Sequence, residues 1–156
     1  MPQRYEPPSD FLNAVIAEEV PLTGGRYADA NLRRLIEVTR DADRVNRDWA
    51  VLLLSQAGGD TPAVHDALLR AASDEGNVVR SEAVSGLASR DPDAALPFVQ
   101  QALRGKAIDM PMLEAAVLCA HPSLIADLRV WAEPSENAYL DELAAEALAA
   151  CVRAAG

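Results

Sequence analysis

A two-residue pattern returns at nearly constant spacing along the chain. Its four copies are Trp49-Ala50, Glu82-Ala83, Glu114-Ala115 and Glu146-Ala147, and they begin 33, 32 and 32 residues apart. Such a period indicates stacked repeats, in which each unit buries its apolar face against its neighbours. Four residues after each alanine stands an apolar residue, and these are Leu54, Leu87, Cys119 and Cys151. Because residues i and i+4 share one face of a helix, the pattern predicts the buried face of one helix in every repeat.

Prolines that follow a polar residue divide the repeats into helix pairs. Thr61-Pro62, Asp91-Pro92 and His121-Pro122 each place a polar residue before a proline, an arrangement expected where a helix begins. We therefore expect helices and no strands. The expected helices lie near 9–20, 28–40, 43–57, 62–73, 77–89, 93–104, 110–120, 122–132 and 136–153. Pro97 would then be tolerated as a first-turn residue of its helix.

Polar residues repeat as well. Asp41, Arg47, Ala50 and Leu54 have the same spacing as Asp74, Arg80, Ala83 and Leu87. This pattern resembles the HEAT repeat, especially its short bacterial form, which is also found in phycobiliprotein lyase-like proteins. The specific resemblance covers about residues 41–104. It implies an all-α, right-handed α-solenoid of stacked antiparallel helix pairs, that is, a HEAT- or armadillo-like superhelix.

The resemblance also implies a role for the repeated charges. In HEAT repeats the Asp lies in the turn before the first helix, and the Arg on that helix joins it in a ladder between neighbouring repeats. Carried over to this chain, the ladder comprises Asp41, Arg47, Asp74 and Arg80. A guanidinium fork suits such a junction because it can satisfy carboxylate and backbone oxygens together.

The length of 156 residues fits one domain with its own core. We expect residues 1–156 to form a single solenoid domain. Its parts would be an N-terminal helical cap at 1–40, repeats at 41–73, 74–106 and 107–133, and a C-terminal capping helix at 134–156.

The chain is acidic throughout, with a formal net charge of −10. Lys and Arg stand at 8 against 13 Asp and Glu in residues 1–78, and at 6 against 11 in residues 79–156. Each half is therefore −5, which disfavours a nucleic-acid partner because phosphates require clustered basic residues. No segment has the apolar length of a secretory signal or a membrane span. A cytoplasmic protein without a membrane partner is the expectation.

Few residues suggest catalysis or a cofactor. His65 and His121 lie at different helix starts, without cysteines or carboxylates at metal-ligand spacing. The stretch Ala57-Gly58-Gly59-Asp60 lacks the lysine and hydroxyl of a phosphate-binding loop. We expect no enzyme activity, no metal and no cofactor.

The second helix of each repeat is the expected binding face, because by resemblance these helices line the concave side of a HEAT array. Helical periodicity turns a mixed polar row outward on them. Its candidate contact residues are His65, Arg70, Gln100, Gln101, Arg104 and Arg129. The predicted function is a non-catalytic protein–protein interaction module or scaffold, for which a basic partner would complement the acidic charge.

Trp49 departs from the repeat because the other three copies carry glutamate at this position. Two interpretations stay open. The N-terminal helix with Phe11, Leu12, Val15 and Ile16 could cover the indole, or Trp49 could be an aromatic anchor for a partner.

Two alternative functions also stay open. The acidity is compatible with an immunity or antitoxin-like inhibitor of a basic toxin. The resemblance to lyase-like HEAT proteins suggests an accessory bilin-lyase-like protein, which would have to bind a bilin.

Overall fold

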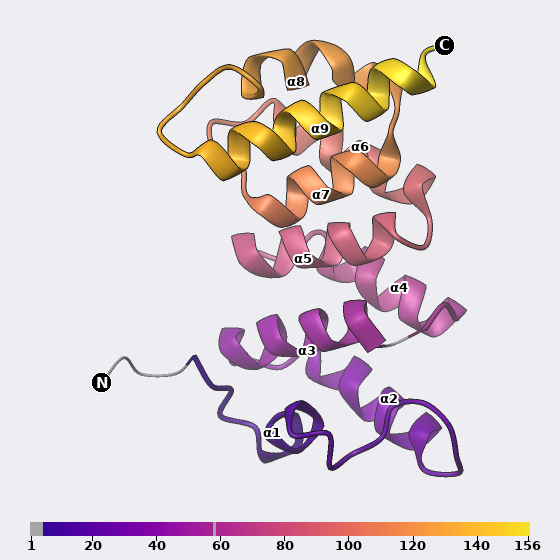
Figure 1. Cartoon of the computed structure of the whole chain (residues 1–156). Coiled ribbons are helices and arrows are strands. Elements are labelled where there is room, and N and C mark those ends of the chain that lie inside the picture. The colour runs from indigo at the N-terminus through magenta and orange to yellow at the C-terminus, as the bar shows by residue number, and fades with distance from the viewer. Residues whose placement is uncertain (1–4, 58) are drawn as a thin grey trace. The chain divides into compact units, whose positions relative to one another are not determined.

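All regular structure in the described part of the chain is helical. The computed structural model describes residues 5–57 and 59–156 (Figure 1). Its helices are α1 (Asp10–Ile16), α2 (Ala28–Val38), α3 (Arg44–Ala57), α4 (Pro62–Ala71), α5 (Asn77–Ala88), α6 (Pro92–Leu103), α7 (Met110–Cys119), the 3-10 turn η1 (Pro122–Leu124), α8 (Ile125–Trp131) and α9 (Ala138–Ala154). The order and approximate extent of the helices agree with the sequence prediction.

Polar residues cap the helices where the prolines predicted their starts. The Thr61 side chain accepts a hydrogen bond from the Val64 amide at the start of α4, and the Asp91 side chain accepts one from the Ala94 amide in α6. His121 accepts from the Ser123 amide and so caps the short turn η1 instead of a full helix. These caps satisfy amide groups that a helix start leaves without partners.

Pro97 lies deeper in its helix than the sequence prediction allowed. Helix α6 begins at Pro92, so Pro97 is an interior residue and not part of the first turn. The prediction was wrong because the helix starts earlier than expected, at the proline directly after the Asp91 cap. A proline here cannot donate the usual bond to the carbonyl four residues earlier.

The repeated pattern marks the buried helix face as expected. Its four alanines, Ala50, Ala83, Ala115 and Ala147, are all fully buried. Of the apolar residues that follow them, Leu54, Leu87 and Cys151 are also fully buried, whereas Cys119 is only partly buried. Alanine suits these positions because a small side chain lets neighbouring helices approach closely.

Residues 1–83 form the first of two compact units. Within its described part, α1 and α2 pack against α3, and α4 packs against α2 and α3. Its core contains the fully buried Leu12, Leu35, Leu54 and Leu68. A side-chain bond adds to this packing, because the Ser55 hydroxyl donates to the Glu82 carbonyl at 3.2 Å.

Residues 84–156 form the second compact unit. Here α9 packs against α7 and α8, and α6 packs against α7. The buried side chains include Val99, Leu113 and Leu128. The Trp131 indole donates to the Leu103 carbonyl at 2.8 Å and so ties the end of α8 to the last turn of α6.

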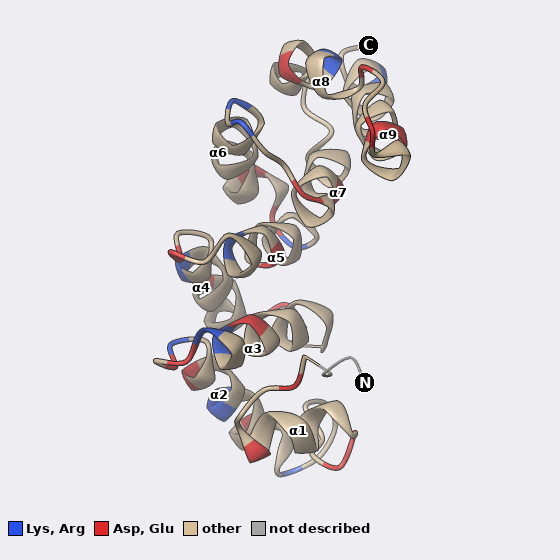
Figure 2. Ribbon diagram, turned by 90° about the vertical axis from the view of Figure 1, so that its left-hand side faces the viewer, with Lys and Arg blue, Asp and Glu red and all other residues tan. Residues whose placement is uncertain are grey.

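The helix surfaces carry both signs of charge. Acidic and basic positions are interspersed around the turn between α2 and α3 (Figure 2). None of the helices in the described part of the chain is long and apolar enough to cross a membrane.

The packing predicts different costs for the same substitution at two leucines. Leu54→Ala should lower the free energy of unfolding by about 2–5 kcal/mol, because it opens a cavity at a fully buried position. Leu69→Ala on α4 is the matched control, since Leu69 is 37% exposed and should cost about 1 kcal/mol or less. Urea unfolding followed by circular dichroism measures both. Equal losses would contradict the assignment of Leu54 to the core.

Candidate functional site

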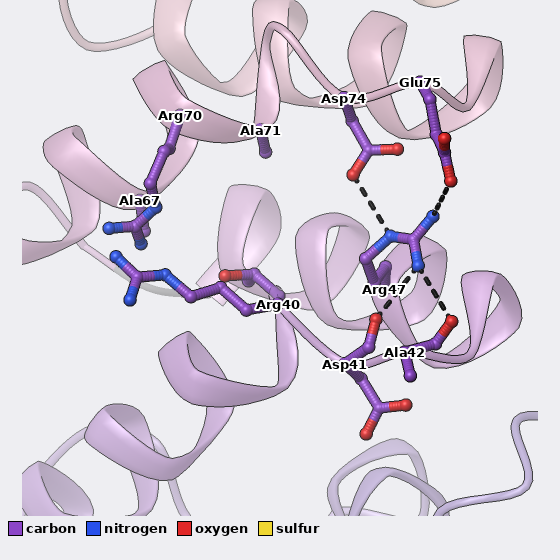
Figure 3. Close-up of a pocket in the computed structure, with 10 residues that line it drawn as sticks. Arg40, Asp41, Ala42, Arg47, Ala67, Arg70, Ala71, Asp74 and Glu75 are labelled. Carbon is purple, nitrogen blue, oxygen red and sulfur yellow. Dashed lines mark hydrogen bonds and ion pairs between the residues drawn. The ribbon is translucent and has the colours of Figure 1, made fainter.

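A charged junction connects the turn before α3 with the turn before α5. The Arg47 Nε donates to Asp74 Oδ2 at 3.1 Å, and its Nη1 donates to the carbonyls of Asp41 at 2.9 Å and Ala42 at 3.1 Å (Figure 3). The Nη2 of Arg47 lies 3.6 Å from Glu75 Oε1. One guanidinium group therefore holds its own turn and the following turn together.

The contacts of Arg47 with the carbonyls of its own turn have a counterpart one repeat later. The Arg80 Nη1 donates to the carbonyls of Asp74 at 2.8 Å and Glu75 at 3.1 Å, and its Nη2 bonds Asn77. The structure thus places Asp41, Arg47, Asp74 and Arg80 in one chain of contacts. In this chain of contacts, Arg47 bonds the backbone carbonyl of Asp41 and Arg80 bonds that of Asp74. Both carbonyls precede a helix start and have no helical partner.

Burial makes the Arg47–Asp74 pair more than a surface contact. The side chains of Arg47 and Asp74 are only 11% and 14% exposed. Asp74 Oδ1 accepts in addition from the Gly76 amide at 2.8 Å. A partly buried pair with several hydrogen bonds is weakly screened, and losing one partner leaves the other charge uncompensated.

An open pocket lies beside this junction in the first unit. It has a volume of about 480 Å³. Its walls come from the end of α2, the turn that follows, α3, α4 and the turn after α4. The lining residues are Thr39, Arg40, Asp41, Ala42, Arg47, Ala67, Arg70, Ala71, Asp74 and Glu75. Carboxylates and Arg47 lie at one end, and Arg40 and Arg70 lie at the other (Figure 3).

Two predicted contact residues, His65 and Arg70, lie on α4. Arg70 is exposed and lines the pocket. The pKa of Arg70 is lowered by partial burial and, second, by the positive charge of Arg40, while Asp66 opposes the shift. The half-buried His65 lies away from that lining, with its Nδ1 3.6 Å from Asp66 Oδ1. The pocket therefore includes Arg70 and not His65.

In the second unit, the predicted residues of α6 interact with η1 and α8. The Gln100 side chain donates to the Ser123 hydroxyl at 2.8 Å, and Arg104 Nε lies 3.6 Å from Asp127 Oδ2. Arg104 is nevertheless 68% exposed, so the ion pair is accessible to solvent. Gln101 and Arg129 are also exposed. The α6 row thus offers polar groups at the surface.

Trp49 is covered by the segment before α1. Its ring stacks on Tyr5 with centroids 6.3 Å apart, and its Nε1 donates to the Tyr5 carbonyl at 3.0 Å. The Tyr5 hydroxyl donates in turn to Asp48 Oδ2 at 2.8 Å. Burial and this bond to Asp48 raise the pKa of Tyr5, which favours the protonated donor. Trp49 is half-buried, and its ring contact and its hydrogen bond come from Tyr5, which precedes α1.

The cysteines and histidines belong to no metal-binding cluster in the described residues. Both cysteines are free. Burial raises the pKa of the Cys119 thiol to about 11 and also raises the pKa of Cys151. Across residues 5–57 and 59–156, no cluster of three or more His, Cys, Asp or Glu could hold a metal ion. High thiol pKa values disfavour nucleophilic thiolates.

Sequence reasoning did not identify Arg40 or Tyr5. Arg40 ends the α2 segment directly before the repeated Asp41, and the corresponding residue in the next repeat is Ser73. Tyr5 lies in a proline-containing segment with no helical periodicity. Neither residue belongs to a repeated pattern, so only the tertiary structure shows what they contact.

Comparisons with known proteins agree with the helical architecture. A family model described as HEAT repeats matches residues 32–118. Among solved structures, the X-ray structure of YibA from Escherichia coli aligns with a TM-score of 0.64 at 18% identity, covering 88% of this chain. This chain spans about half of that protein, 54% of its length. No curated protein matches the sequence significantly. The predicted all-α solenoid class is confirmed.

The junction predicts that Arg47 is more important for stability than an exposed arginine. Arg47→Ala should lower the free energy of unfolding by about 1–3 kcal/mol, because it leaves a partly buried carboxylate and two carbonyls without their donor. Arg47→Lys should be intermediate, since an ammonium keeps the charge and loses the fork. Chemical denaturation measures these differences. Arg33→Ala is the control, since exposed Arg33 makes one long bond of 3.4 Å to the Asp29 carbonyl. The same small loss in both alanine variants would contradict the structural role of the junction.

The pKa of Cys119 predicts slow thiol chemistry. At pH 8 the thiolate fraction of a group with a pKa of about 11 is roughly 100-fold below that of an ordinary thiol. In the Cys151→Ala variant, which removes the contribution of Cys151 to this shift, modification of Cys119 by a disulfide reagent should still be slower than in the same variant unfolded in urea, because burial is the largest cause of the raised pKa. Equal rates in the folded and unfolded protein would show that Cys119 is not protected.

Proposed function

Because the chain belongs to the HEAT-repeat family, we propose that it is a non-catalytic protein-binding module whose partner contacts the outward faces of α4, α6 and α8. HEAT repeats generally mediate protein–protein interactions, and helical repeats present rows of side chains to their partners. In the predicted repeats these three are the second helices, which by resemblance line the binding face.

The separation of buried and exposed residues on α4 carries this proposal. Val64, Ala67, Leu68 and Ala71 are buried on one side of the helix. Arg70 is exposed at the border of this buried side, where it lines the pocket. A rigid helix that presents an arginine beside an open pocket is a suitable surface for a partner, because arginine is enriched among binding hot spots.

Helix α6 supports the same interpretation in the second unit. Val99 and Leu103 are buried, while Gln101 and Arg104 are exposed. The bond from Gln100 to Ser123 and the ion pair of Arg104 with Asp127 orient the polar side chains of this row. Preoriented side chains lose less conformational entropy when a partner binds. Arg104 would remain available because its side chain is largely exposed.

Trp49 has a different role in this proposal. Its stacking on Tyr5 and its bond to the Tyr5 carbonyl fasten the N-terminal segment to α3. We therefore assign Trp49 to packing and place the partner contacts on the second helices.

Charge reversal on the second helices tests the proposed surface. Arg70→Glu combined with Arg104→Glu should reduce recovery of the natural partner at least about tenfold, since two contact arginines become repulsive or unpaired. The measurement is affinity capture from the native cell with quantitative mass spectrometry. A basic partner among the captured proteins would favour the toxin-inhibitor alternative.

The matched control is Arg33→Glu combined with Arg153→Glu. It changes the charge equally, with one exposed arginine in each unit, outside the proposed surface. Both double variants should unfold at nearly the wild-type temperature. Unchanged capture by a folded Arg70→Glu/Arg104→Glu protein would overturn the proposed surface, and equal losses in both double variants would reduce it to a general charge effect.

A further inference from the structure

Two arginine side chains converge at one end of the pocket in the first unit. Arg70 extends from the last turn of α4, and Arg40 extends from the turn after α2 (Figure 3). In this view their guanidinium groups lie next to each other, and the charge of Arg40 acts on Arg70. Each guanidinium has five N–H donors and carries one positive charge, so the two arginines present many donors at this end of the pocket.

These two arginines differ from Arg47 in the same pocket. Arg47 is paired with Asp74 and Glu75 and also bonds two backbone carbonyls. Among residues 5–57 and 59–156, neither Arg40 nor Arg70 has an ion pair or a side-chain hydrogen bond to a protein acceptor. The positive charge of Arg40 is the second cause of the lowered pKa of Arg70 after burial, while Asp66, one turn earlier on α4, partly opposes the shift.

The carboxylates in the pocket are already engaged elsewhere. Asp74 bonds Arg47 and the Gly76 amide. Asp41 Oδ1 accepts from the Asp43 amide at 2.8 Å and from the Asn46 side chain at 3.3 Å. Because the Asp41 and Asp74 side chains are held in these turns, neither neutralises the arginine pair.

Small residues keep the space in front of the arginines open. Ala67 and Ala71 lie one turn apart on α4 and form the wall of the pocket on this side. Neither fills the gap that a longer side chain would occupy. The volume of about 480 Å³ is within the range of roughly 300–1,000 Å³ found for ligand pockets, and the pocket is open to the surface. A side chain from another protein can therefore reach the pair.

The charges in the pocket favour a singly charged ligand group. Arg40, Arg47 and Arg70 balance Asp41, Asp74 and Glu75, so the lining has a formal charge of zero. A carboxylate would leave the occupied pocket at −1, whereas a phosphate dianion would leave it near −2 in a protein of net charge −10. Planar carboxylates also match the guanidinium fork. At physiological salt the Debye length is about 8 Å, so the nearby arginines outweigh distant acidic residues.

We propose that Arg40 and Arg70 form a binding site for the carboxylate of an aspartate or glutamate side chain on a protein partner. This inference rests on the proposed protein-binding function and adds the chemistry of one contact. The carboxylate bridges the two guanidinium groups, replaces their mutual repulsion with charge-assisted hydrogen bonds, and fixes the partner beside α4.

A direct test uses two peptides in place of the unidentified partner. The probes are acetyl-Gly-Glu-Gly-Glu-Gly-amide and the same peptide with glutamine at both glutamates. Each is titrated to 20 mM against ¹⁵N-labelled protein while the arginine Nε–H signals are recorded by NMR. We expect saturable shifts of the Arg40 and Arg70 signals with the glutamate peptide, and at least tenfold weaker binding of the glutamine peptide. Raising the salt to 0.5 M should weaken the binding.

Three variants locate the site. Arg40→Gln and Arg70→Gln should each weaken the glutamate peptide at least tenfold, because a charge-assisted pair is lost. Arg33→Gln removes an exposed arginine of α2 outside the pocket and should leave the affinity unchanged. Neither pocket variant should unfold below the wild-type temperature, since each removes one of two repelling charges. This readout separates a binding pair from a structural one.

Several outcomes would overturn the inference. These are equal binding of the two peptides, full affinity in Arg40→Gln and Arg70→Gln, no shift of either arginine signal at 20 mM peptide, or tighter binding of inorganic phosphate than of the glutamate peptide. If none of these peptide effects appears while Arg70→Glu/Arg104→Glu still abolishes partner capture, the protein-binding function stands and only the carboxylate site is lost.

Discussion

The contact between Arg47 and Asp74 determines the local geometry of the first unit. A helix start leaves its first amide groups without helical partners, and the carbonyls of the turn before it also need donors from elsewhere. Arg47 supplies those donors to Asp41 and Ala42 and reaches the carboxylate of Asp74 with the same planar group. A lysine has no fixed fork with which to serve three acceptors in different directions. The junction therefore requires arginine at this position and an acidic residue in the next turn.

The same junction shapes the pocket beside it. The junction residues line this pocket together with Arg40 and Arg70, which are thirty positions apart in the sequence. At the end of the pocket that holds Arg47, the charged groups pair with one another. At the other end, neither Arg40 nor Arg70 has a paired acceptor among the described residues. Neighbouring arginines thus have different roles. Arg47 contributes to stability, whereas Arg40 and Arg70 are available for binding.

Much of the fold could be predicted from the sequence because the period is repeated. Comparing copies shows that Ala50, Ala83, Ala115 and Ala147 occupy one structural position, and all four are buried. The proline breaks located the helix starts because capping and proline chemistry are local. The same local rules gave the wrong position for Pro97 within its helix. A shift of one residue in the helix start decides whether a proline is in the first turn or in the interior. Local rules therefore give the elements more reliably than their exact ends.

The site could be predicted only in part, because the sequence reveals residues that recur with the repeat and not residues that occur once. Arg47 and Arg80 recur with the repeat, so their pattern was visible. Arg40 and Tyr5 occur once, and their contacts depend on segments brought together by folding. Within one pocket, the hydrogen-bond partners then distinguish arginines that the sequence treats alike. Arg47 is nearly buried and has acceptors on every side, so its charge is used by the fold. Arg40 and Arg70 are exposed and lie next to each other without a protein acceptor in the described residues, so the fold tolerates a repulsion that a carboxylate would relieve.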